Sequence, residues 1–411
     1  MLQKIASREL LLKQKVNEDV GDIVAYTSSI FDFALEQKAS DVHIEPNQNS
    51  VIIRFRSSGD FIFVDKISIE EYAKLISRIK ILANLRIDEK QRPQDGKIAY
   101  RSERWDESID VRVSILPLVE GEKVVMRILR QDTSLLSLDK LNFLDVNLEK
   151  IKTSLASRYG IILVAGPTGS GKSTTLFSML KSFDPLEFNI STLEDPVEYN
   201  IPFINQSQVK PQIGFDFAAG LRSLVRQDPD IIMVGEIRDK ETAMLAIEAA
   251  LTGHLVLSTI HTNSAAGTIN RLINMGVEPF LIASALKMVI SQRLVKKLCD
   301  KCHTTFNITD PTTANTISTA LAGVVDDPVG EIEFYKPVGC LHCENTGYRG
   351  RMGVHEVLMM DESLNPLILG KASVQDLDAK ARELGMVTVL QDALIKAATG
   401  LTSIEESLQL I

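Results

Sequence analysis

The stretch GPTGSGKST, residues 166–174, constrains the fold of this 411-residue chain more than any other feature. It matches the pattern G-x-x-x-x-G-K-[ST], in which glycines let backbone N–H groups turn inward around phosphate oxygens. The apolar residues 161–165 before it predict a buried strand, and TTLFSML after it predicts a helix. A strand, a glycine loop and a helix in this order indicate a phosphate site in an α/β domain. A glycine-rich turn without a ligand is the alternative.

Each residue type in the loop has an expected role. Lys172 meets the β and γ phosphates, the Ser173 hydroxyl reaches Mg²⁺, and the start of the helix adds partial positive charge. The candidate ATP-binding residues of the loop are Gly166, Pro167, Thr168, Gly169, Ser170, Gly171, Lys172, Ser173 and Thr174.

Three further apolar stretches end in polar residues and alternate with expected helices, which predicts a parallel sheet covered by helices. DIIMVGE ends at Glu236, which could bind Mg²⁺ through water or polarise the attacking water. Most Walker B strands, the apolar strands that supply this carboxylate beside a phosphate loop, end in Asp. Glu236 is therefore atypical, and a solvated glutamate is the alternative. NISTLED ends at Glu194 and Asp195, where ligands bind in open α/β sheets. We favour Glu194 for water and Glu236 for magnesium, although the sequence cannot rank them.

HLVLSTIHTN is the third of these stretches, with His261 just past its end. His261 could sense the γ phosphate, or it could make only a structural hydrogen bond. His254 precedes the strand, and we expect it to be structural.

Composition and charge exclude some classes of function. The net charge of −9 makes nucleic acid a poor default partner, because duplex binding usually needs a basic face. No apolar run approaches the roughly 18 residues that span a bilayer, and the charged N-terminus lacks the apolar core of a signal peptide. We therefore expect a cytosolic protein.

The pattern along the chain predicts several domains. Before the phosphate loop, an amphipathic helix, a hairpin around Ser-Gly-Asp, a second helix and two strands around a glycine turn predict an α+β domain. After residue 294 the chain becomes irregular and ends in short helices. We expect a helix or linker at 1–19, the α+β domain at 20–131, a linker at 132–140, the parallel-sheet core at 141–293, a cysteine-containing subdomain at 294–355 and a helical subdomain at 356–411.

All four cysteines stand in two Cys-x-x-Cys pairs, LCDKC and GCLHC. Four thiolates complete a tetrahedral structural zinc site, and disulfides are rare in a reducing cytosol. The redox alternative needs a thioredoxin-like context, of which nothing in the sequence gives a sign. His303 and His342 are adjacent, but four sulfurs already saturate the site. The expected ligands are Cys299, Cys302, Cys340 and Cys343.

These motifs together resemble one family, the secretion ATPases that drive type II secretion and type IV pilus assembly. The resemblance is carried by GPTGSGKST, TLEDPVEY, VGEIRD and TGHLVLSTIHTN, with ASDVHIEP and RPQDGKI upstream, and it covers residues 20–411. It implies a RecA-like P-loop ATPase core preceded by a small α+β, PAS-like domain. It also implies a homo-hexameric ring that binds ATP, Mg²⁺ and Zn²⁺, with ATP between the two domains.

The resemblance also suggests roles for several arginines. Arg112 and Arg127 align with arginines that reach the γ phosphate from the N-terminal domain, where a guanidinium stabilises charge on the transferred group. Without the resemblance, both would be interpreted as exposed strand arginines. Further family arginines near the nucleotide or the subunit interface match Arg222, Arg226 and Arg238, with Arg351 a further candidate; a solvated helix face remains the alternative for Arg222 and Arg226.

Partners and location follow from the same resemblance. In this family, assembly and secretion motors carry the four-cysteine site, whereas retraction motors generally lack it. The implied partners are an inner-membrane platform protein and a membrane docking protein that faces the cytoplasm. The implied location is the cytoplasmic face of the inner membrane, without nucleic acid as a partner. Family members usually begin with a further N-terminal domain, and this chain starts almost at the second one, which puts docking in doubt.

Two other functions compete with the motor. A nucleotide-binding scaffold would change shape with ATP but scarcely turn it over. A RecA-like nucleic-acid motor would need a basic and aromatic binding patch, which the acidic balance of the chain disfavours.

Overall fold

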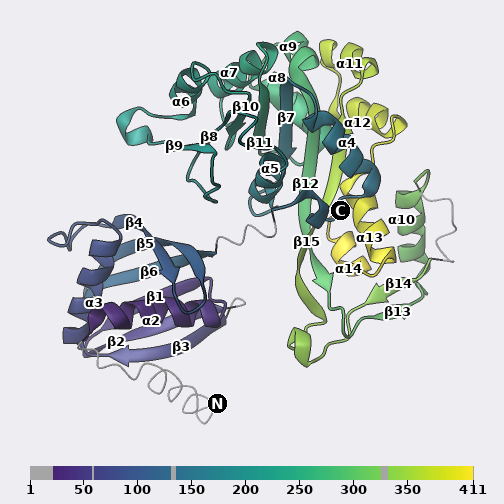
Figure 1. Ribbon diagram of the computed structural model, residues 1–411. Coiled ribbons are helices and arrows are strands. Elements are labelled where there is room, and N and C mark those ends of the chain that lie inside the picture. Colours follow the sequence, from purple (N-terminus) through teal and green to yellow (C-terminus); the bar gives the residue numbers. More distant parts are fainter. Residues whose placement is uncertain (1–21, 58–59, 131–135, 325–331, 411) are drawn as a thin grey trace. The chain divides into compact units, whose positions relative to one another are not determined.

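The computed structural model describes residues 22–57, 60–130, 136–324 and 332–410. The chain divides between residues 132 and 133 into two compact units (Figure 1). The helix or linker expected at 1–19 and part of the linker expected at 132–140 lie outside the described residues.

The first unit is a six-stranded antiparallel sheet in the order β3-β2-β1-β6-β5-β4, with two helices. Alternate strand residues such as Val42, Ile44, Val111 and Val113 enter one core together with apolar residues of both helices. Both helices therefore cover the same face of the sheet. The elements are α2 (Ile23–Glu36), β1 (Asp41–Asn47), β2 (Ser50–Ser57), β3 (Asp60–Ile67), α3 (Ile69–Leu82), β4 (Gln94–Ser102), β5 (Glu107–Leu118) and β6 (Gly121–Arg130).

The second unit is built on a seven-stranded sheet in the order β15-β12-β7-β11-β10-β8-β9. All neighbouring pairs are parallel except β12 with β15. Its strands are β7 (Gly160–Ala165), β8 (Ile190–Glu194), β9 (Asn205–Gln208), β10 (Ile231–Val234), β11 (Leu255–Ile260), β12 (Leu286–Leu298) and β15 (Tyr348–Met359). The four apolar stretches that predicted strands form β7, β8, β10 and β11.

Helices cover both faces of this sheet, because the parallel strands are apolar on both sides. Within β7, Ile161 and Leu163 pack into one core, whereas Ile162 and Val164 pack into the other. The first core holds residues of α6 (Phe217–Leu224), α7 (Lys240–Leu251), α8 (Ala265–Asn274), α9 (Pro279–Ala285), α11 (Asn365–Leu369) and α12 (Val374–Glu383), and the second holds residues of α4 (Asp145–Leu155) and α5 (Lys172–Leu180).

A smaller cluster lies beyond the sheet, where Ile317, Phe334 and Leu394 pack together. Its elements are β13 (Thr304–Phe306), α10 (Pro311–Leu321), β14 (Phe334–Lys336), α13 (Val389–Ala398) and α14 (Ile404–Leu408). The boundaries expected at 293/294 and 355/356 fall inside β12 and β15. These two strands pair from Met288–Met359 to Leu298–Tyr348, so a continuous ribbon joins the cysteine segment to the sheet (Figure 1).

Candidate functional site

The phosphate loop connects β7 to α5, in the order that the motif predicts. Gly166, Gly169 and Gly171 all have positive φ, at 150°, 80° and 88°. Residues with a Cβ rarely adopt these angles, so the curved backbone requires glycine here. Gly171 is the N-cap of α5, and the free N–H groups of the first helical turn therefore point into the loop.

The Lys172 side chain lies inside this curve. Its Nζ donates to the carbonyl oxygens of Gly166 and Pro167, at 2.9 and 3.0 Å. Burial lowers the pKa of the Lys172 ammonium, while the Glu236 carboxylate opposes that shift. A cation held at the centre of a ring of backbone donors is suited to phosphate oxygens.

Glu194 ends β8 and is buried, with 3% of its surface exposed. Its Oε1 accepts hydrogen bonds from Thr192 Oγ1 at 2.6 Å and from Gln206 Nε2 at 2.9 Å. Burial raises the pKa of the Glu194 carboxyl above its ordinary value, although these hydrogen bonds oppose the rise. A buried carboxylate with a raised pKa is suited to accept a proton.

Glu236 follows β10 and contacts two side chains, Arg238 and His261. Arg238 donates to its Oε1, and His261 Nε2 lies 3.3 Å from its Oε2. The hydrogen bond from Arg238 to Glu236 raises the pKa of that guanidinium. His254 is placed elsewhere, with its Nδ1 2.8 Å from the carbonyl oxygen of Ala249, which fits the structural role expected for it.

One cavity of about 570 Å³ brings the sequence candidates together. It lies at the carboxyl ends of β7, β8, β10 and β11, where open α/β sheets bind ligands. Its lining includes these expected residues: Thr168, Gly169, Gly171, Lys172, Ser173, Thr174, Glu194, Glu236, Arg238, His261 and Arg351. The Ser173 hydroxyl and the Glu236 carboxylate share the cavity, and they are the oxygen ligands that Mg²⁺ prefers.

Other arginine candidates lie outside this cavity. Arg222 forms an ion pair with Glu241, and Arg226 Nη1 donates to the carbonyl oxygen of Arg222 at 2.6 Å. Neither arginine is among the residues that line the cavity. Arg112 and Arg127 belong to the first unit, where they are paired across β5 and β6. Arg127 Nε lies 3.0 Å from Asp41 Oδ1.

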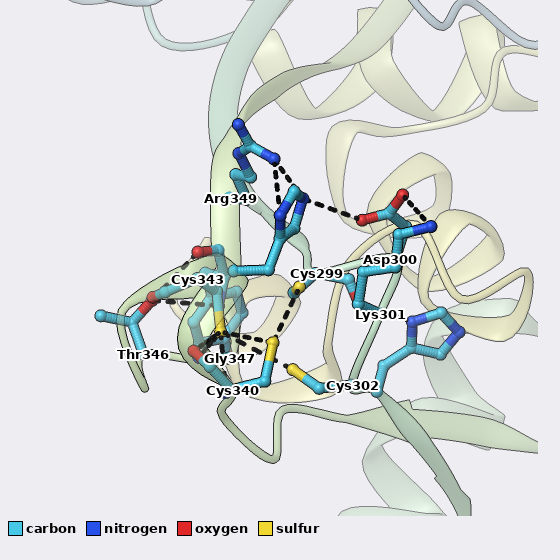
Figure 2. Close-up of polar contacts among 12 residues, drawn as sticks. Cys299, Asp300, Lys301, Cys302, Cys340, Cys343, Thr346, Gly347 and Arg349 are labelled. Atoms are coloured by element: carbon cyan, nitrogen blue, oxygen red, sulfur yellow. Dashed lines mark hydrogen bonds and ion pairs between the residues drawn. The ribbon is translucent and has the colours of Figure 1, made fainter.

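The four cysteines meet at one end of the β12–β15 ribbon, where one pair follows β12 and the other precedes β15 (Figure 2). Their sulfurs all lie within 4.8 Å of one another, and three pairs are separated by 3.7 to 3.9 Å. A tetrahedral site with Zn–S bonds of about 2.3 Å has sulfurs about 3.8 Å apart, so the donor set fits zinc. Burial alone would raise the pKa of the Cys343 thiol, but N–H groups of Cys340 and Gly347 lower it to about 6.

Both adjacent histidines contact groups other than these sulfurs. His342 contacts Arg349, and its Nε2 lies 3.7 Å from Asp300 Oδ1 (Figure 2). His303 Nδ1 lies 2.8 Å from the carbonyl oxygen of Cys299. The site therefore offers four sulfur ligands, and each histidine already has another hydrogen-bond partner.

Sequence reasoning missed several residues that shape the cavity. Thr192 and Gln206 bind Glu194, and Gln292 of β12 contacts the phosphate loop. Thr192 had a signal, since it stands two residues before Glu194 on the same side of a strand. No sequence signal marked Gln206 or Gln292, because Gln206 is 12 residues from Glu194 and Gln292 is 122 residues from Ser170.

A family model and individual related proteins assign this chain to the same family. A family model described as type II/IV secretion system protein matches residues 16–409. The chain is 44% identical over 390 residues to the type IV pilus assembly ATPase PilB of Myxococcus xanthus, covering 94% of this chain and 68% of that protein. It is 41% identical over 409 residues to type II secretion system protein E of Pseudomonas aeruginosa, covering 100% and 79%.

A further relative and two solved structures extend the comparison. The PilB of Thermus thermophilus is 46% identical over 375 residues, which cover 91% of this chain but only 41% of that protein. The crystal structure of the pilus retraction motor PilT with bound ADP matches with a TM-score of 0.66 and 25% identity, over 93% of this chain and 96% of that one. The Legionella pneumophila ATPase DotB matches with a TM-score of 0.65 and 23% identity, over 94% and 95%, and supports the fold alone.

Proposed function

This chain belongs to the type II/IV secretion system protein family, and we propose that it is a Mg²⁺-dependent ATPase motor for assembly of a pilus or pseudopilus. The observation that carries the proposal is the single cavity shared by Lys172, Ser173, Glu194 and Glu236. A cation, a hydroxyl and two carboxylates at the end of a parallel sheet are the groups that phosphoryl transfer to water requires.

The groups have separate roles in hydrolysis. Backbone N–H groups of the loop and the Lys172 ammonium bind the β and γ phosphates. Glu194 orients a water molecule and accepts its proton as the water oxygen attacks the γ phosphorus, and the bond from that phosphorus to the bridging oxygen breaks. Ser173 and Glu236 would hold Mg²⁺, which when bound neutralises charge on the phosphate oxygens. His261 and Arg238 contact Glu236 and hold its carboxylate at the edge of the cavity.

The wider assembly is part of the same proposal. We expect a homo-hexamer of RecA-like cores at the cytoplasmic face of the inner membrane, bound to a platform protein and a docking protein. Arg112 and Arg127 of the α+β unit, for which we propose a PAS-like fold, would reach the γ phosphate when the two units close around ATP. Arg222 and Arg226 would act at a subunit interface. Zn²⁺ on the four cysteines would have a structural role. Among the described residues, no helix is long and apolar enough to cross a bilayer.

Loss of the loop lysine tests the proposal. Lys172→Ala removes the cation that meets the phosphates, so we expect the Mg²⁺-dependent ATPase rate to fall at least about 100-fold. Lys181→Ala is the control, because Lys181 is an exposed lysine at the other end of α5. A Lys172→Ala protein that hydrolyses ATP at the wild-type rate would refute the motor. Tight ATP binding by the wild-type chain without turnover, measured over a range of protein concentrations, would favour the scaffold instead.

A further inference from the structure

The strand next to the phosphate loop places one buried glutamine against it. β12 runs parallel to β7, and Ser291 pairs with Ala165, the last residue of β7. Beyond that point β7 turns into the phosphate loop, whereas β12 continues for seven more residues to Leu298. The next residue of β12, Gln292, therefore lies beside the start of the loop.

The Gln292 amide is used at both ends. Its Nε2 donates to the carbonyl oxygen of Ser170 at 2.6 Å, and its Oε1 accepts from Thr175 Oγ1 at 2.7 Å. The residue is 3% exposed, so water does not compete for these hydrogen bonds. Gln292 belongs to neither the loop nor α5, but its amide links the loop at Ser170 to the first turn of α5 at Thr175.

Two of the motif glycines lie against the same residue. A Cβ on Gly166 would lie 2.6 Å from the Gln292 carbonyl oxygen, and a Cβ on Gly171 would lie 2.8 Å from Gln292 Nε2. Both positions need glycine for their φ angles as well. The close packing of Gln292 gives a second reason why a larger residue cannot stand there.

The following residue, Arg293, extends these contacts to the loop after β11. Arg293 Nη1 donates to the Gln292 carbonyl oxygen at 3.1 Å, and its Nη2 donates to the carbonyl oxygen of Asn263 at 2.9 Å. Asn263 stands two residues after His261, which lines the cavity. The pair of β12 residues therefore connects the phosphate loop to the loop that follows β11.

We propose that Gln292 is a positioning residue that holds the phosphate loop in its nucleotide-binding shape. It does not line the cavity, and it acts through Ser170 and Thr175. The inference rests on the proposed function, because it assumes that the loop binds nucleotide phosphates. Pre-forming the loop lowers the entropy cost of binding, so Gln292 contributes to affinity for nucleotide.

Gln292→Leu keeps the size of the side chain and removes both hydrogen bonds. We expect the Kd for MgADP to rise about tenfold or more, measured by calorimetry, and backbone amides of residues 168–171 to exchange hydrogen faster. MgADP is the probe because it binds without turnover. The matched control is Gln391→Leu. Gln391 is also buried and also uses both ends of its amide, with Thr388 N and Ala320 O, but it lies outside the cavity.

Gln292→Glu supplies a readout that a purely structural role would not produce. An ionised carboxylate cannot donate to the Ser170 carbonyl oxygen, whereas a protonated one can. Relative to wild type at each pH, the affinity of Gln292→Glu for MgADP should recover as pH falls. If Gln292→Leu does not fold, Thr175→Val removes one of the two hydrogen bonds and should still weaken binding several-fold.

The outcomes separate this inference from the proposed function. A wild-type chain that does not bind MgADP would overturn the proposed function and this role together. Wild-type binding with an unchanged Kd in Gln292→Leu, or with equal losses in Gln292→Leu and Gln391→Leu, would overturn only the positioning role.

Discussion

At the scale of single residues, the cavity holds two glutamates in different surroundings. Glu194 is buried among neutral hydrogen-bond donors, whereas Glu236 contacts Arg238 and His261. A buried carboxyl with a raised pKa suits proton transfer, and a carboxylate beside an arginine at the edge of the cavity suits a role near Mg²⁺. The structure therefore gives a physical reason for the division of roles that we favoured from the sequence, and that division stays a prediction.

Isosteric substitutions distinguish the two roles. Glu194→Gln cannot accept a proton, so we expect kcat to fall at least about 100-fold with little change in ATP affinity, at any Mg²⁺ concentration. Glu236→Gln should instead raise the Mg²⁺ concentration needed for half-maximal rate. Rates measured over a Mg²⁺ titration test both, with the exposed Glu187→Gln as control. A rate of Glu194→Gln restored by Mg²⁺ would reverse the assignment.

The hydrogen bond from Thr192 to Glu194 allows the proposed role of Glu194 to be tested by pH. Glu194 must be ionised to accept a proton, and burial raises its pKa, so kcat should fall with decreasing pH above the range of an ordinary glutamate. The Thr192 hydroxyl lowers that pKa. Thr192→Val should therefore move the acidic limb of the kcat profile to higher pH. Thr268→Val, a buried threonine bonded to Thr262 and Ser264, should leave the limb in place. An unmoved limb in Thr192→Val would mean that another group titrates.

At the scale of elements, the β12–β15 ribbon joins the nucleotide cavity to the four cysteines. Leu294 of β12 and Arg351 of β15 line the cavity, and Cys299 directly follows β12. Between the two cysteine pairs, Ile317 and Phe334 pack against Leu394 of α13, and the sulfur cluster brings the two pairs together at the end of the ribbon. A metal that binds all four sulfurs would therefore fix the far end of the ribbon.

Metal content tests this arrangement. We expect one zinc ion per chain in the wild type and none in Cys340→Ser, with faster amide hydrogen exchange over residues 299–347 in that variant. His342→Ala is the control and should keep its zinc, because His342 contacts Arg349 and Asp300 and not the sulfurs. Loss of zinc from His342→Ala would show that the histidine is a ligand.

At the scale of the whole molecule, the chain forms two compact units, and we propose that hydrolysis needs both. The described residues that line the cavity belong to the second unit, and Arg112 and Arg127 stand on adjacent strands of the first. If the two units must close to complete the site, loss of an arginine from the first unit should slow hydrolysis without preventing nucleotide binding.

We therefore expect Arg112→Ala or Arg127→Ala to keep MgADP binding within about threefold and to lower kcat at least about 100-fold, since arginine acts on transition-state charge. In the wild type, the rate per chain should climb with protein concentration, as a ring requires. Lys66→Ala on β3, away from these strands, is the control. Full activity in both arginine variants would show that neither Arg112 nor Arg127 takes part in hydrolysis.

The sequence by itself determined the features that depend on local pattern. The phosphate loop, the strands that lead to Glu194 and Glu236, and the paired cysteines were all predicted, because glycine spacing, apolar runs and Cys-x-x-Cys spacing act over a few residues. The family also follows from these motifs, and the matches to secretion and pilus ATPases confirm it.

Only the tertiary structure decided which distant residues meet. β12 and β15 were not predicted as strands, since their pairing depends on residues at least 50 positions apart in sequence. That pairing places Gln292 against the phosphate loop and Arg351 in the cavity, and the packing of α6 leaves Arg222 beside Glu241 outside it. Hydrogen bonds and burial across a sheet depend on strand order, and no local pattern records strand order.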